Sequence, residues 1–171
     1  MSAVVPEAQL EERHRLGLDH RDELWDGVLH MVPPAGDPHQ GLSAELFLVL
    51  GPLAKRLGLV PRMETGLFRH EKDYRVPDQL YRRPDDGSVR GAEAAELVVE
   101  ILSPDDETWQ NLPWFVELGV REVLVLNPRD RTARLFREGV EVTPRSEVLG
   151  VTFETVDGTL RLTWEDGEAV V

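Results

Sequence analysis

Two acidic residues stand at places in the sequence where a metal site could form. Glu100 lies within residues 97–102, and all the remaining residues of this run are leucine, valine or isoleucine. Asp78 follows Pro77, at a point where a strand either begins or is interrupted. Burying a carboxylate costs free energy unless the group is paired or bound to a cation. Hard divalent cations such as Mg²⁺ prefer carboxylate oxygens as ligands.

Two interpretations of Glu100 are open at this stage. In the functional interpretation, Glu100 and Asp78 together hold a divalent cation. In the structural interpretation, Glu100 forms an ion pair with an arginine such as Arg75 or Arg121. Because side chains alternate along a strand, Glu100 shares its face with the residues two positions away on either side. Spacing alone does not separate the two interpretations.

The elements that position these residues follow from turn signals and periodicity. Asp26 and Gly27 separate two alternating apolar runs, which predicts a two-residue hairpin. Residues 1–20 predict a short helix over the body of the protein. Leucines and a valine at helical spacing predict a long helix over 39–58, preceded by a cap at Asp37 and a first-turn proline.

The second half of the chain predicts a strand, a helix and a strand in succession. The apolar run at 97–102 is typical of a central strand that is covered on both faces. A helix over 107–118, ended by Gly119, and a buried strand at 122–126 follow it. Such a unit forms a parallel crossover. The other strands are predicted at 65–69, 74–81, 133–137, 140–142, 151–154 and 160–164.

Composition limits the class of protein. A chain of 171 residues with 41% hydrophobic and 30% charged residues predicts a single domain, over residues 1–171, with a real core. A net charge of −13 disfavours a general nucleic-acid coat but leaves room for a local basic cleft. The absence of cysteine excludes disulfides and thiolate metal sites, and suits a cytoplasmic location. The longest apolar run, 46–54, is too short to span a membrane.

Several motifs, in their order along the chain, resemble the Uma-type restriction endonuclease family, which belongs to the PD-(D/E)xK nuclease superfamily. The resemblance runs from about residue 20 to about residue 140. It implies a restriction-endonuclease-like central mixed sheet flanked by helices. The order of the predicted elements itself gives an α/β fold of the mixed α+β kind, with an N-terminal hairpin and C-terminal antiparallel strands. The matching segments are Asp-Glu-Leu-Trp-Asp-Gly at 22–27, His39-Gln40, Pro77-Asp78, Glu-Ile-Leu-Ser-Pro at 100–104, Asp-Glu-Thr-Trp at 106–109 and Gly-Val-Arg-Glu-Val-Leu-Val-Leu at 119–126.

The same resemblance implies roles for three residues. Asp78 matches the aspartate of the first element and Glu100 the acidic residue of the second, so both would hold Mg²⁺ or Mn²⁺ for phosphodiester hydrolysis. The superfamily lysine two positions after the acidic residue is replaced by Leu102. In the Uma-type family this lysine lies on the following helix, at the position of Asn111. Losing one such electrostatic group commonly costs about 10²–10³ in rate.

Other residues are weaker candidates. Glu23 and His39 are candidate substrate-binding residues, although Glu23 also suits an ordinary hairpin and His39 a packed or capping histidine. Ser103 suits a strand end better than a nucleophile, because no histidine accompanies it. Two further groups have mainly structural interpretations. The acidic group stabilises a helix N-terminus and consists of Asp105, Asp106 and Glu107. The aromatic group belongs to the core and consists of Trp109, Trp114 and Phe115.

Three functions follow from these observations. The first is a Mg²⁺-dependent endonuclease, weakened by Asn111, with DNA as a substrate that the net charge disfavours. The second is a catalytically silent binding or regulatory module with the nuclease fold. The third is a metal hydrolase of a small phosphate compound, for which an acidic exterior is no obstacle. C-terminal strands with an open edge, together with the resemblance, also predict a homodimer.

Overall fold

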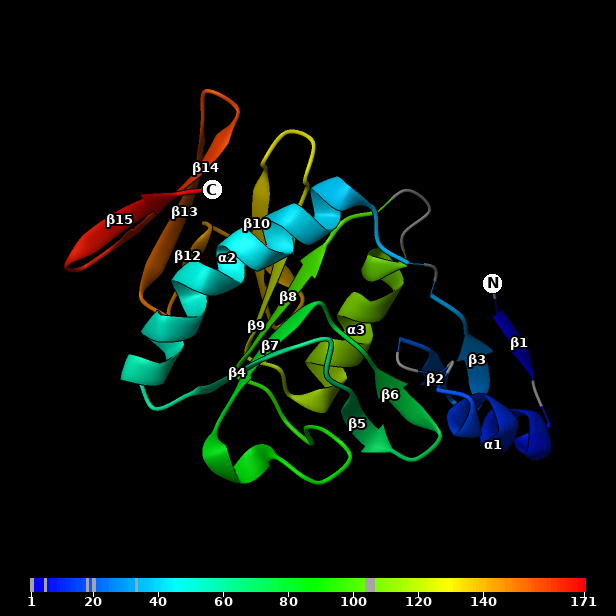
Figure 1. Cartoon of the computed structure of the whole chain (residues 1–171). Coiled ribbons are helices and arrows are strands. Elements are labelled where there is room, and N and C mark those ends of the chain that lie inside the picture. The colour runs from blue at the N-terminus through cyan, green and yellow to red at the C-terminus, as the bar shows by residue number, and fades with distance from the viewer. Residues whose placement is uncertain (1, 5, 18, 20, 33, 104–106) are drawn as a thin grey trace.

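The computed structural model describes residues 2–4, 6–17, 19, 21–32, 34–103 and 107–171, and within these ranges the chain forms three sheets and three α-helices (Figure 1). The central sheet is mixed and has six strands in the order β11-β10-β9-β8-β7-β4. Its strands are β4 (Val60–Met63), β7 (Gln79–Arg82), β8 (Leu97–Ile101), β9 (Glu122–Leu126), β10 (Ala133–Arg137) and β11 (Val140–Val142).

The predicted crossover forms the middle of this sheet. β8 and β9 are parallel, with Leu97 opposite Glu122, and α3 (Thr108–Leu118) connects them. Gly119, at a φ of 88°, ends α3 in the left-handed conformation that favours glycine. The helix begins one residue later than predicted because Glu107 takes the N-cap position. The predicted mixed sheet flanked by helices is therefore confirmed.

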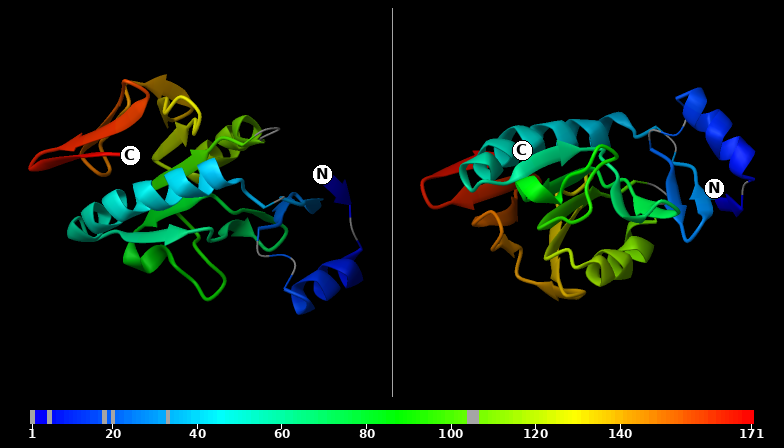
Figure 2. Two further views of the ribbon diagram at one scale, coloured as in Figure 1. Left: turned by 45° about the horizontal axis from the view of Figure 1, so that its top comes forward. Right: turned by 90° about the horizontal axis from the view of Figure 1, so that it is seen from below.

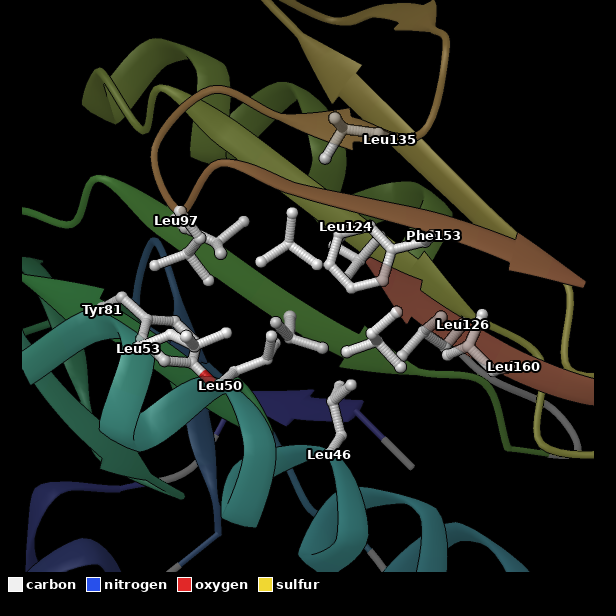
Figure 3. Close-up of a cluster of buried hydrophobic side chains, with 14 of the residues drawn as sticks. Leu46, Leu50, Leu53, Tyr81, Leu97, Leu124, Leu126, Leu135, Phe153 and Leu160 are labelled. Atoms are coloured by element: carbon white, nitrogen blue, oxygen red, sulfur yellow. The ribbon is translucent and has the colours of Figure 1, made fainter. Parts of the chain in front are cut away.

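Helices α2 (Asp37–Arg56) and α3 cover opposite faces of the central sheet (Figure 2). Leu46 and Leu50 of α2 pack toward Leu97 and Leu124, as Figure 3 shows. On the other face, α3 residues pack with Val98 of β8 and with Val123 and Val125 of β9. Both neighbouring strands are buried on two faces, as their continuous apolar sequences predict.

The C-terminal segment adds an antiparallel sheet over the α2 side of the central sheet. Phe153 and Leu160 reach the same core as α2 (Figure 3). The predicted C-terminal strands are confirmed, and the sheet also contains β15, which the sequence did not predict. Its strands are β12 (Arg145–Ser146), β13 (Val151–Val156), β14 (Thr159–Trp164) and β15 (Gly167–Val170).

The N-terminal sheet lies at the other end of the molecule (Figure 2). The predicted hairpin joins β2 to β3, and Asp26 and Gly27 adopt positive φ at its turn. The strand order is β1-β3-β2-β6-β5, and the strands are β1 (Ser2–Val4), β2 (Glu23–Trp25), β3 (Val28–His30), β5 (Leu67–His70) and β6 (Asp73–Arg75).

Three predictions about the elements are wrong. Residues 1–20 are not one helix over the body, because β1 pairs with β3 and α1 (Glu7–Arg15) has no buried residue. Residues 74–81 are not one strand, because the chain passes from β6 to a different sheet at β7, and Pro77 has no N–H for a ladder.

The third error concerns α2, which begins at Asp37 with Gly36 as its N-cap instead of beginning at residue 39. The sequence also did not predict β4, an edge strand in which Pro61 is tolerated because one side of the strand lacks a partner. No helix of the described part of the chain is both long and apolar enough to cross a membrane.

Candidate active site

Asp78 and Glu100 come together because β7 and β8 are paired antiparallel. Gln79 lies opposite Val99, which places the preceding Asp78 beside Glu100. The backbone N–H of Asp78 donates to Glu100 Oε2 at 3.3 Å, and the N–H of Ile101 donates to Asp78 Oδ2 at 2.8 Å. Both residues are largely buried, with exposed fractions of 5% and 7%. Two acidic residues 22 positions apart in the sequence thus lie side by side, as predicted.

A pocket with a volume of about 440 Å³ opens over this pair. Its wall contains all five residues that the sequence singles out as site candidates: Glu23, His39, Asp78, Glu100 and Asn111. They come from β2, the first turn of α2, the segment before β7, β8 and α3. Other polar residues of the same wall are Arg21, Ser103, Glu107 and Thr108.

Asp78 also contacts two positively charged or chargeable groups. His39 Nε2 lies 3.0 Å from Asp78 Oδ2, and Arg21 Nη2 lies 3.3 Å from Oδ1. Arg21 also contacts Glu64 Oε1 at 3.2 Å. Nδ1 of His39 is buried and has no hydrogen-bond partner among the described residues. Sequence reasoning missed Arg21, because no spacing or motif connects it to a residue 57 positions away.

The arginines that the structural interpretation offers to Glu100 have other partners. Arg75 forms an ion pair with Asp73 at 2.9 Å. Arg121 lies beside the start of β9 and contacts Glu96 and Glu147 at 3.7 and 3.9 Å. Neither of these ion pairs involves Glu100.

Glu23 is held inside the wall of the pocket. Its Oε1 accepts a hydrogen bond from the Val76 N–H at 2.8 Å, and its Oε2 accepts one from Trp25 Nε1 at 2.7 Å. Burial raises the pKa of Glu23, although these two hydrogen bonds and the nearby Arg75 lower it in part. The proton of this carboxyl group is therefore held to a higher pH than that of an exposed glutamate.

Asn111 faces the pocket from α3, and its side chain is fixed from behind. It is only 6% exposed, and its Oδ1 accepts a hydrogen bond from Arg75 Nε at 2.8 Å. Arg75 lies between two indoles, with its guanidinium carbon 4.5 Å from the ring centres of both Trp25 and Trp114. His30 stacks on the other face of this layered group, 3.8 Å from Trp25. We refer to His30, Trp25, Arg75 and Trp114 as the aromatic–arginine stack.

The weaker candidates have mainly structural places. Trp114 and Phe115 are buried in the core, as predicted, whereas Trp109 is 41% exposed and lies against Phe136. Glu107 precedes α3 and contacts His30 Nδ1 at 2.9 Å. Asp105 and Asp106 lie outside the described residues.

A different cluster of potential ligands lies in the N-terminal sheet. Within the described ranges, Asp26, His70 and Asp73 offer ligand atoms that lie within 4.8 Å of one another. Asp73 already receives hydrogen bonds from Trp114 and Arg75. Its carboxylate is therefore occupied by neutral and charged donors, and this cluster contains neither of the predicted ligands.

Comparisons with known proteins place this geometry in context. The model of the Uma2 family, described as "Putative restriction endonuclease", matches residues 8–164. A crystal structure described as a putative nuclease belonging to DUF820, from Anabaena variabilis, has a TM-score of 0.60 and 19% sequence identity; the similarity covers 70% of this chain and 73% of that one. At this identity the similarity shows the fold, and it confirms the predicted nuclease-like architecture.

A second structure resembles part of the chain more distantly. The cryo-EM structure of a DrdV–DNA complex has a TM-score of 0.40 and 17% identity, over 61% of this chain and 10% of that one. A TM-score this low supports no argument about the present chain. No curated protein matches the sequence.

Proposed function

Because the chain belongs to the Uma2 family of restriction endonuclease-like proteins, we propose that it is a divalent-metal-dependent endonuclease that hydrolyses phosphodiester bonds in DNA. The observation that carries this proposal is the juxtaposition of Asp78, just before β7, and Glu100, on the paired strand β8, inside a pocket. The proposed active site consists of these two ligands and Asn111, with Glu23 and His39 as substrate-binding residues, in a single nuclease-like domain over residues 1–171.

The donor set of the pocket fits Mg²⁺ or Mn²⁺. Asp78 and Glu100 both offer carboxylate oxygens, and Mg²⁺ typically takes one or two protein carboxylates and completes its shell with waters and phosphate. A bound cation there would lower the pKa of a water molecule and neutralise charge on the phosphate. A pocket of about 440 Å³ leaves room for these waters and for one phosphate group.

Residues around Asp78 orient the carboxylate and the substrate. The Ile101 N–H and His39 Nε2 both contact Oδ2 of Asp78, which leaves Oδ1 turned toward Arg21. A guanidinium binds phosphate oxygens as readily as carboxylate oxygens. We infer that Arg21, which lines the pocket, would bind the substrate phosphate there.

Two observations favour other functions with the same fold. The net charge of −13 favours a small phosphate compound as substrate, because an acidic surface repels duplex DNA. Asn111, in place of the family lysine, favours a catalytically silent binding module, because an amide carries no charge to stabilise the transition state. The three functions differ in metal binding and in the substrate that is cleaved.

The decisive experiment compares cleavage of supercoiled plasmid DNA and of bis-p-nitrophenyl phosphate in Mg²⁺ and Mn²⁺. We expect metal-dependent nicking by the wild-type protein and its loss in Asp78→Asn and Glu100→Gln. Glu141→Gln, which changes an exposed carboxylate on β11 paired with Arg134, is the matched control and should cleave normally.

Each alternative has its own result in the same assay. Cleavage of the small diester without nicking indicates the small-substrate hydrolase. Metal binding and cleavage both absent indicate the silent module. Nicking that persists in Asp78→Asn and Glu100→Gln contradicts the proposed active site.

A further inference from the structure

We propose that Arg75 is a positioning residue that fixes the Asn111 side chain with its amide N–H group toward the pocket, so that a neutral donor backed by a buried guanidinium contacts the substrate phosphate. This inference rests on the proposed function and goes beyond it, because no motif in the sequence connects Arg75 with the site. It explains how a chain without the family lysine still presents a phosphate-binding group at position 111.

The guanidinium of Arg75 has little freedom to move. Its Nη1 donates to the carbonyl oxygen of Leu24 at 3.0 Å, to that of Tyr74 at 3.1 Å and to Asp73 Oδ1 at 2.9 Å. The planes of Trp25 and Trp114 enclose it from both sides. Its Nε–H group therefore points in a direction that the fold sets, and that direction is toward Asn111 Oδ1.

This contact decides how the Asn111 amide is turned. The two ends of an asparagine amide are nearly isosteric, so its orientation has to be assigned from hydrogen-bond partners. A guanidinium has no acceptor, so only the carbonyl oxygen of Asn111 can face Arg75 Nε. The N–H group then lies on the opposite side of the amide. Because Asn111 lines the pocket with Asp78 and Glu100, a donor is available there.

The charge behind Asn111 strengthens this donor. Asp73 is shared between Arg69, at 3.1 Å, and Arg75, at 2.9 Å, so one carboxylate faces two guanidinium groups. A hydrogen bond from a cation to the carbonyl oxygen polarises the amide, and this effect is larger in a buried site than in water. The amide N–H thereby becomes a better donor to an anionic oxygen.

The rest of the aromatic–arginine stack holds the same wall of the pocket. Trp25 donates to Glu23 Oε2 at 2.7 Å, and His30 Nδ1 contacts Glu107 Oε2 at 2.9 Å. Both carboxylates line the pocket. Three successive layers of the stack thus each contact one polar residue of the pocket, which is the arrangement expected of a support that sets side-chain positions.

A double-mutant cycle tests the coupling between Arg75 and Asn111. Plasmid cleavage by Arg75→Met, Asn111→Ala and the double variant gives kcat and KM, and thermal melting reports folding. We expect Asn111→Ala to lower kcat by about 10²-fold, Arg75→Met to approach the same loss, and the double variant to be no worse than Asn111→Ala. Arg134→Met removes an arginine that also lies over a tryptophan and should leave kcat unchanged.

Asn111→Asp keeps the proposal testable if Arg75→Met does not fold. An aspartate at position 111 retains the shape of the side chain, and its ion pair with Arg75 offsets the repulsion by Asp78 and Glu100, so the melting temperature should stay close to that of the wild type. The variant loses the donor, and we expect kcat to drop by at least about 10²-fold. Wild-type cleavage by Asn111→Asp, or losses in the cycle that simply add, would overturn the role of Arg75 while leaving the metal site intact.

A binding measurement separates this inference from the proposed function. In the full-length protein, inorganic phosphate with Mg²⁺ should shift the side-chain amide NMR signals of Asn111, and Arg75→Met should abolish that shift. If phosphate leaves these signals unchanged in the wild type, the inference fails, whether or not DNA is cleaved. If substitution of Asp78 and Glu100 leaves cleavage unchanged but phosphate still shifts the Asn111 amide signals, the proposed active site is wrong and the phosphate contact of Asn111 is supported.

Discussion

Two buried glutamates in neighbouring parallel strands have very different surroundings. Glu122 begins β9 and accepts hydrogen bonds from Arg137 Nε at 2.9 Å, from the Glu147 N–H at 2.8 Å and from the Ser146 hydroxyl. Glu100 lies near the other end of β8, beside Asp78, and lines the pocket. The first carboxylate is enclosed by donors from later parts of the chain, and the second is placed where a cation can reach it.

The comparison shows that a carboxylate in an apolar strand does not identify a site by itself. An ion pair between a strand glutamate and an arginine is found at Glu122, with Arg137 as the partner. The two ends of the sheet differ because residues 145–149 cover one end and supply backbone N–H groups. At the other end, the chain passes from β6 of the N-terminal sheet to β7 of the central sheet, and the pocket opens at this junction.

The largest expected difference between the two glutamates concerns metal binding. Asp78→Asn and Glu100→Gln should each abolish weak Mn²⁺ or Mg²⁺ binding, measured by titration calorimetry, whereas Glu122→Gln should retain it. Glu100→Gln should also melt at a higher temperature than the wild type without metal, because it removes repulsion between two carboxylates. Binding that survives in Asp78→Asn or Glu100→Gln would reject the site.

The reverse difference should appear in stability. Glu122→Ala removes the buried partner of Arg137, which keeps its contact with Glu147 at 3.3 Å, and leaves several buried donors without an acceptor, so we expect a loss of about 1–3 kcal/mol in the free energy of unfolding. The kcat of the molecules that remain folded should be unchanged. Urea unfolding followed by circular dichroism measures this loss, and a change below about 1 kcal/mol would mean that Glu122 is not the structural counterpart of Glu100.

A third change adds an ammonium group to the pocket that contains Glu100. Asn111→Lys should increase metal-dependent plasmid nicking by about 10²-fold, because an ammonium in the pocket stabilises developing charge on the phosphate. Asp78→Ala combined with Asn111→Lys is the control and should not cleave. Nicking should be compared at several salt concentrations, because low salt strengthens the repulsion of DNA by the acidic surface. Equal cleavage by the variant and the wild type would show that position 111 does not replace the lysine.

The smallest expected effect concerns Glu23, a third buried glutamate. Burial raises its pKa in the folded protein above the value in the unfolded chain, so the folded state holds this proton to a higher pH. The stability that the protonated group contributes is present below the unfolded pKa and is lost as the pH rises through the folded pKa. Glu23→Gln should therefore remove this decline from the unfolding free energy, measured from about pH 4 upward. If the unfolding free energies of Glu23→Gln and the wild type change with pH in the same way, the raised pKa of Glu23 is contradicted.

Sequence reasoning predicted which residues lie together better than it predicted the boundaries of the elements around them. Continuous apolar strands, a turn at Asp26 and Gly27, and a helix stop at Gly119 are local signals, and the structure contains all three. The resemblance to the nuclease family, and not these local signals, implied that Asp78 and Glu100 lie at the ends of adjacent strands. The same criteria would have selected Glu122, which follows Arg121 at the start of an equally apolar strand, and they give no reason to exclude it.

What the sequence could not predict depends on contacts between distant residues. The aromatic–arginine stack joins β2, β3, β6 and α3, and no periodicity connects His30 with Arg75 or Trp114. The division of residues 74–81 between two sheets depends on which strands pair with each half of the segment. Pro77 indicates only that the strand is interrupted. Arg21 precedes the N-terminal hairpin, and its contact with Asp78 depends on how the N-terminal and central sheets come together.

The aromatic–arginine stack also gives the protein an optical signal of its own. The protein has four tryptophans, and two of them, Trp25 and Trp114, lie against the Arg75 guanidinium. Trp25 also lies against the ring of His30. Indole emission responds to charges in van der Waals contact with the ring. A phosphate or cation that shifts Asn111 or Glu23 alters those charges, so occupancy of the pocket can be followed by intrinsic fluorescence without a label.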